Sequence, residues 1–155
     1  MGDLINEILA QLKAEASLKL VSIWNNQFDF LEDGKGYAFP FPCAFIELST
    51  ENFQNVGESY QSIDATLNIH IGQDVYNGSY MDENTTIFTL RDAVVRKMSN
   101  FKPSKAGNMM KTSEQQDYNH SNVYHYIISY QFHFIDNTSV KQEYSSTPPT
   151  NWRAI

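Results

Sequence analysis

The chain has 155 residues and a formal net charge of −7, from 11 Lys and Arg residues against 18 Asp and Glu residues. This length fits one domain with a substantial hydrophobic core, and no apolar run approaches the roughly 18 residues of a membrane-spanning helix. Because affinity for nucleic acid comes largely from Lys and Arg that neutralise phosphates, the acidic balance and the lack of a basic run argue against a DNA-binding role.

The N-terminal segment predicts an amphipathic helix that Asp3 can cap. Its apolar residues recur at helical spacing, at Leu4, Ile5, Ile8, Leu9 and Leu12. Such a stripe suits a helix that lies on a sheet or against a partner chain. The segment lacks the basic start and cleavage site of a signal peptide, so we expect the protein to be intracellular when made.

The next stretch, LKLVSIWNNQFDFLEDGKGY, suggests strand structure at Val21, Ile23, Phe28 and Phe30, followed by a turn at EDGKG. Two prolines then precede an apolar run, CAFIEL, and a proline belongs at an edge or before a strand because it cannot donate a ladder hydrogen bond. We therefore place a strand at Cys43–Leu48.

Cys43 is the only cysteine of the chain. It allows no internal disulfide, and a four-cysteine zinc site is excluded. Its position between Pro42 and an apolar run favours a buried structural thiol over a nucleophile.

The polar segment STENFQNVGES is predicted to be a loop or the tip of a long hairpin, and the strand Tyr60–Gly72 follows it. Alternate residues of this strand are apolar: Ile63, Ala65, Leu67, Ile69 and Ile71. The residues between them are polar: Ser62, Asp64, Thr66, Asn68 and His70. Such alternation is typical of a strand with one buried face.

A second helix is predicted to begin near Asp82–Thr85 and to stop before Pro103. Its apolar stripe consists of Ile87, Leu90, Val94, Met98 and Phe101. A short strand near Asn108–Glu114 and a longer one at Val123–Asp136 follow. On the longer strand, one face is mainly aromatic and the other carries His125, Ile127, Ser129, Gln131 and His133.

This order of elements predicts an α+β fold, with a mostly antiparallel sheet and two helices packed on one face. We expect a single domain over residues 1–136 and an extended C-terminal arm over residues 137–155. The aliphatic face of Tyr60–Gly72 and the aromatic face of Val123–Asp136 should point to one core. Their opposite faces should then carry His70 and His133 together.

Two histidines on one sheet face raise the question of a metal site, which needs further ligands and supporting groups. The other two histidines, His120 and His125, lie in and just after a predicted loop and lack the i, i+4 spacing of a helical zinc motif. No phosphate-binding glycine motif or nucleophile elbow is present. We expect no catalytic residue, no cofactor and no metal, and we interpret His70 and His133 as part of a solvated or subunit-facing sheet surface.

The layout resembles the tail-completion and tail-terminator proteins of tailed bacteriophages. The resemblance rests on the opening helix LINEILAQLK, the proline-led strand FPCAFIEL and the long hairpin ELSTENFQNVGESYQSIDATLNIHIG. The helix TTIFTLRDAVVRKMSNF and a closing strand pair that ends in VYHYIISYQFHFID complete it, over most of Leu4–Asp136. The tail after Asn137 does not match the family pattern.

The resemblance implies a non-enzymatic virion protein that forms a closed ring at the neck or upper tail, with the portal or connector above and the tail below. DNA would pass through the ring without specific binding, no membrane would be involved, and the acidic charge suits a channel for a polyanion. Ring contacts would lie on loops, edges and the arm. The candidate interface residues are Glu51, Asn52, Phe53, Gln54, Tyr118, His120, Tyr144, Pro148, Pro149, Trp152 and Ile155.

Two alternatives remain open from the sequence. One is a binding module whose sheet face holds a small ligand or a peptide. The other is a metal-dependent enzyme that uses His70, His133 and nearby acids.

Overall fold

A computed structural model describes residues 1–34, 38–74 and 83–138 of the chain. The elements run in the order α1 (Gly2–Lys13), β1 (Leu20–Ile23), α2 (Gln27–Glu32), β2 (Cys43–Asn55), β3 (Gln61–Asp74), α3 (Glu83–Met98), β4 (Met110–Asp117) and β5 (Val123–Asp136). The predicted α+β class is confirmed. Residues 139–155, most of the predicted arm, lie outside the described residues. No helix of the described ranges is long and apolar enough to cross a membrane.

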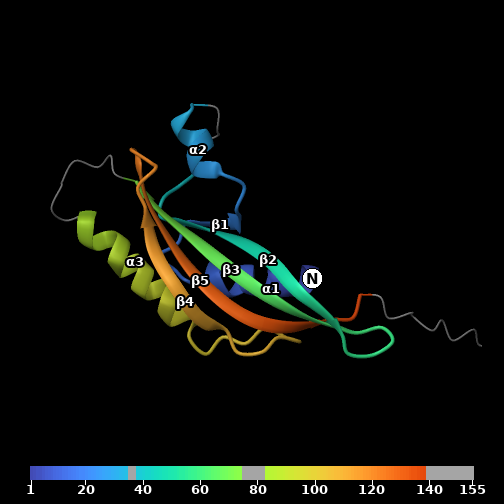
Figure 1. Ribbon diagram of the computed structural model, residues 1–155. Coiled ribbons are helices and arrows are strands. Elements are labelled where there is room, and N and C mark those ends of the chain that lie inside the picture. Colours follow the sequence, from blue (N-terminus) through green and yellow to red (C-terminus); the bar gives the residue numbers. More distant parts are fainter. Residues whose placement is uncertain (35–37, 75–82, 139–155) are drawn as a thin grey trace, which may run out of the picture.

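The five strands form one sheet in the order β1-β2-β3-β5-β4 (Figure 1). Strands β1 and β2 are parallel, and the other three pairs are antiparallel. The sheet is therefore mixed but mostly antiparallel, as predicted. Strand β3 lies at its centre, between β2 and β5.

Strands β3 and β5 pair along their whole lengths, and this register builds the core. Ile63 lies opposite Phe134, Leu67 opposite Tyr130, and Ile69 opposite Ile128. The residues named here belong to one buried cluster, so the predicted common core of the two strands is confirmed. Since side chains alternate along a strand, the intervening polar residues share the opposite face.

Helices α1 and α3 cover the apolar face of the sheet. Both predicted stripes are buried there, through Leu4, Ile8 and Leu12 of α1 and through Ile87, Leu90, Val94 and Met98 of α3. The Gln11 side-chain amide donates a 2.7 Å hydrogen bond to the Lys97 carbonyl and joins the helix ends. The predicted Asp3 cap is wrong, because α1 begins at Gly2 and its N-cap makes no side-chain hydrogen bond.

The predicted strand structure at Phe28 and Phe30 is also wrong, since both residues lie in the short helix α2. Asn26, with φ of 54°, turns the chain after β1, and the Gln27 side-chain amide donates a 2.7 Å hydrogen bond back to the Ile23 carbonyl. The helical spacing then buries Phe28 completely and leaves Phe30 exposed. Two aromatics at i and i+2 therefore mimicked the alternation of a strand.

Strand β2 extends to Asn55, well past the predicted end at Leu48. The polar segment predicted as a loop or hairpin tip pairs with β3 over much of its length, for example Ser49 with Thr66 and Glu51 with Asp64, so it forms the end of a long hairpin rather than a loop. Hydrogen bonding to a central strand thus overrides the polar composition of the segment. The observed β4 begins and ends slightly later than the predicted Asn108–Glu114.

A second, smaller cluster packs on the other face of the sheet beneath α2. Its buried members are Phe28, Cys43, Phe45 and Val123. Cys43 is fully buried, as predicted, and burial raises the pKa of its thiol. The Phe28 ring approaches the sheet at Gly72, where an added Cβ would lie 2.4 Å from the Phe28 Cζ atom.

Because of this close approach, a substitution at Gly72 tests how α2 packs on the sheet. Gly72→Ala should destabilise the protein by about 1–3 kcal/mol, because the added methyl group forces Phe28 or the backbone to move. The free energy of unfolding from urea titration measures the effect. Gly57→Ala is the matched control, since its Cβ would meet only the Tyr60 ring at 3.6 Å. Equal stability of the two variants would contradict this packing.

Candidate functional site

The polar face of the sheet divides into a covered end and an open end. Helix α2 covers the end where β2 begins, while the end near the β2–β3 turn projects away from α2 (Figure 1). Between them a polar row crosses three strands. The Asn68 side chain donates a 2.9 Å hydrogen bond to Glu47, and the Ser129 hydroxyl donates one of 2.8 Å to Asn68.

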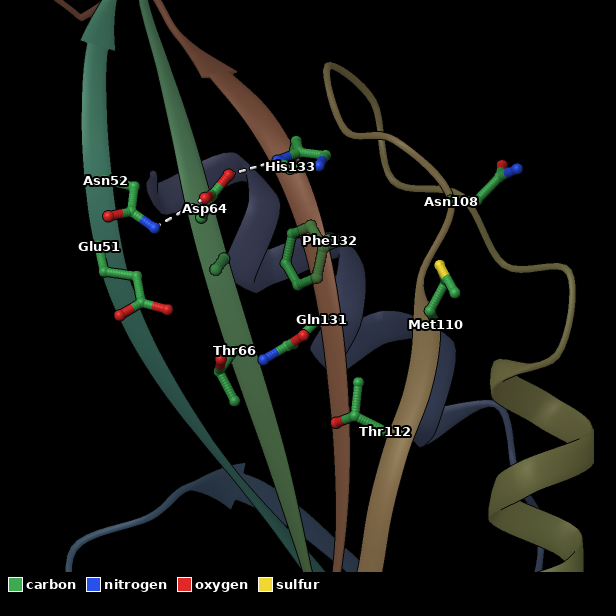
Figure 2. A pocket seen from close by; sticks show the side chains of 11 residues that line it. Glu51, Asn52, Asp64, Thr66, Asn108, Met110, Thr112, Gln131, Phe132 and His133 are labelled. Carbon is green, nitrogen blue, oxygen red and sulfur yellow. Dashed lines mark hydrogen bonds and ion pairs between the residues drawn. The ribbon is translucent and has the colours of Figure 1, made fainter.

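The open end holds a pocket of about 370 Å³ (Figure 2). It is lined by Glu51, Asn52, Asp64, Ala65, Thr66, Asn108, Met110, Thr112, Gln131, Phe132 and His133. Most of these side chains are polar. The pocket therefore suits a partner that brings polar groups of its own.

Asp64 links three strands at this pocket. Asn52 on β2 donates a 3.0 Å hydrogen bond to its carboxylate, and His133 on β5 bonds to the other carboxylate oxygen. Figure 2 shows Asp64 between these two side chains. The hydrogen bonds from Asn52 and then His133 lower the pKa of Asp64, so the group is an anion at neutral pH.

The tip of the β2–β3 hairpin exposes large apolar side chains. Phe53 is 57% exposed, Val56 56% and Tyr60 46%. They lie at the end of the sheet opposite α2 (Figure 1). Exposed apolar groups gathered at one place are typical of a contact surface.

The candidate interface residues fall into three groups. Glu51, Asn52, Phe53 and Gln54 are exposed near the hairpin tip, and Tyr118 is 82% exposed in the β4–β5 turn. His120 is different, because its side chain is only 3% exposed and packs against the sheet. The remaining candidates lie outside the described residues: Tyr144, Pro148, Pro149, Trp152 and Ile155.

Strand β4 forms one edge of the sheet and is mostly exposed. The Arg91 guanidinium of α3 donates hydrogen bonds of 2.7 and 2.6 Å to the Glu114 carboxylate, and Lys111 lies 3.2 Å from the same carboxylate. The Arg91–Glu114 ion pair holds the strand against α3, whereas Lys111 and Glu114 belong to the same strand. Its outer backbone groups face away from β5, the geometry that pairs with a further strand.

The covered end of the polar face contains three histidines in contact. His70 Nδ1 and His125 Nε2 lie 2.9 Å apart and share a hydrogen bond. His125 Nδ1 lies 3.2 Å from Asp117, and His120 Nε2 lies 3.7 Å from the same carboxylate. Burial lowers the pKa of both His70 and His125, so these two rings are neutral at neutral pH.

The structure does not bring His70 and His133 together. His133 pairs with Asp64, which lies six positions along β3 from His70, or roughly 20 Å at strand spacing. His133 is exposed, whereas His70 is buried and stacks on Trp24 with ring centroids 4.1 Å apart. The interpretation of His70 as part of a solvated or subunit-facing surface is therefore wrong.

Sequence reasoning missed the partner that His70 does have. That partner is His125, which the sequence placed on the same polar face. His120 and Asp117 come close to His125 only because β4 and β5 form a hairpin. That register places Asp117 opposite His125, with His120 in the connecting turn. The available signal was the spacing of DYNHSNVYH read as a hairpin.

Comparison with known proteins finds no family model and no curated protein that matches this chain.

The bulge at Asn52 offers a test of how the hairpin end is shaped. Asn52 has φ of 53° and lies where the β2–β3 register shifts. Asn52→Val should cost about 1–2 kcal/mol of unfolding free energy, because a β-branched residue is strained in the left-handed region. Asn52→Gly keeps that backbone freedom and should cost less than the valine variant. Urea unfolding of both variants checks this order, which the reverse ranking would contradict.

Proposed function

We propose that the protein is a structural subunit of a tailed-phage virion, which assembles with copies of itself into a ring around the DNA path at the head–tail connector or the upper tail. The observation that carries this proposal is the β2–β3 hairpin, which extends from the sheet and exposes Phe53, Val56 and Tyr60 at its tip. The order of helices and strands that resembles the tail-completion and tail-terminator proteins supports the same conclusion.

A ring needs two different patches on each subunit, one that meets the other on the neighbour. The hairpin tip supplies an apolar patch, and the exposed edge of β4 supplies backbone groups for a second contact. These surfaces belong to different parts of the sheet, so one subunit can use both at once. The hairpin tip and the β4 edge then join neighbouring subunits, and the ring lies between portal or connector proteins above and tail proteins below.

The charge of the chain fits this role. A net charge of −7 disfavours adhesion of a polyanion, because phosphate contacts require Lys and Arg. DNA would therefore pass through such a ring without being held.

The pocket in Figure 2 favours a second candidate function, a module that binds a small polar ligand or a peptide. Its volume of about 370 Å³ lies within the range of small-molecule sites, roughly 300–1,000 Å³. Ligand-dependent shifts in melting temperature, together with a monomeric mass, would favour this function over the ring.

Light scattering after gel filtration and negative-stain imaging test the ring directly. The purified chain should form closed rings, either alone at high concentration or after mixing with portal and tail proteins of a tailed phage. A chain that stays monomeric under both conditions contradicts the proposal.

Substitutions at the hairpin tip test which surface assembles the ring. The double variant Phe53→Ser and Val56→Ser should lower the assembled fraction at least tenfold, since loss of about 1.4 kcal/mol of contact energy already changes an equilibrium tenfold. Phe30→Ser is the matched control, because Phe30 is exposed on α2 and away from the hairpin. Equal assembly of the two proteins would exclude the hairpin tip as an interface.

A further inference from the structure

The covered end of the polar face brings three potential metal ligands together. Asp117 ends β4, His125 lies opposite it on β5, and His120 lies in the turn between them. One donor atom from each residue lies within 4.8 Å of the other two. His125 Nδ1 and His120 Nε2 lie 3.2 and 3.7 Å from the same Asp117 oxygen. In a tetrahedral zinc site with bonds of 2.0–2.2 Å, neighbouring ligand atoms are about 3.4 Å apart.

The His125 ring shows a feature that an ion would explain. Its Nδ1 atom is buried and makes no hydrogen bond among the described residues, although the Asp117 carboxylate lies only 3.2 Å away. A buried ring nitrogen without a hydrogen bond is costly. A cation between the imidazole and the carboxylate would satisfy both groups.

The other nitrogen of the His125 ring has the partner that a metal-bound histidine needs. His125 Nε2–H can donate to His70 Nδ1 at 2.9 Å, and His70 Nε2 lies 3.4 Å from Glu47. His120 Nδ1 lies 3.7 Å from Asp29 of α2. His125 thus connects through His70 to the Glu47 carboxylate, the arrangement that fixes the tautomer and orientation of a metal ligand.

Aromatic rings enclose this cluster and restrict water. Trp24 stacks on His70, and Phe28 contacts His125 and His120 with ring centroids 4.8 and 5.8 Å apart. A low-polarity shell strengthens the attraction between a cation and a carboxylate. The chemistry of two imidazoles and one carboxylate favours zinc and related transition metals over magnesium or calcium.

We propose that Asp117, His120 and His125 bind one divalent transition-metal ion of the zinc class. A water molecule completes the tetrahedron, and His70 together with Glu47 orients the His125 imidazole. The ion fastens the β4–β5 turn to the sheet and, through His120 and Asp29, to α2. Figure 1 shows α2 and this turn at the same end of the sheet. The site is separate from the hairpin tip and does not rest on ring assembly.

The test starts from full-length protein stripped of metal with a chelator and titrated with zinc. One zinc ion should bind per chain, and the melting temperature should rise by roughly 5–10 °C at free zinc about 100-fold above Kd. Magnesium at the same concentration should give no shift. Cobalt should add the visible absorption bands of a tetrahedral site. Failure of the wild-type chain to bind stoichiometric zinc, or absence of a thermal shift, overturns the proposal.

Two variants test the proposed ligands, and a third serves as the control. Asp117→Asn and His120→Gln keep the side-chain size and should each lower zinc affinity at least tenfold, with the fold checked by circular dichroism. His133→Gln is the matched control, since His133 also pairs with an aspartate on this face, at the far end. Zinc binding that persists unchanged in either ligand variant, or that the control loses equally, overturns the site. Should a ligand variant fail to fold, the cobalt spectrum of the wild type still decides, because the weak visible bands of six-coordinate cobalt would exclude the proposed tetrahedral site.

Discussion

The antiparallel register between β3 and β5 decides which residues of this protein are available for function. It runs without interruption from the pair Gln61–Asp136 to the pair Asp74–Val123. Because strand side chains alternate, a slip of one residue would turn the whole aliphatic row of β3 toward water. The aliphatic row must be buried under α1 and α3. Because of the alternation, this requirement also determines which residues lie on the polar face.

The same polar face offers two different environments because α2 covers only one end. At that end Trp24 and Phe28 exclude water from His70 and His125, whose neutral rings are favoured by burial. At the other end Asp64 and His133 form their pair at the surface. Similar imidazole and carboxylate groups thus face either an enclosed cluster or an open pocket. The presence or absence of a covering helix, more than residue type, distinguishes the enclosed histidine cluster from the open pocket.

The sequence predicted the long elements well, because their periodicity reflects burial on a single face. The stripe of α3 and the alternation of β3 are examples. It failed where a few residues or a long-range pairing decide the outcome. Helix α2 depends on a left-handed turn at Asn26, which the spacing of Phe28 and Phe30 concealed. The histidine cluster depends on the β4–β5 register and on a helix from another part of the chain. Neither dependence leaves a periodic signal.

In the proposed ring, the two ends of the molecule would meet different requirements. A ring closes only if every subunit presents its two patches at a constant angle, so the hairpin and the β4 edge must not move relative to each other. Strand β3 provides this coupling, since it forms one side of the hairpin and pairs with β5, which in turn pairs with β4. The Arg91–Glu114 ion pair holds the middle of β4 to α3. The proposed metal ion at Asp117 would hold its end, so that the edge would be fixed at two points and the hairpin tip would provide the other contact of the proposed ring.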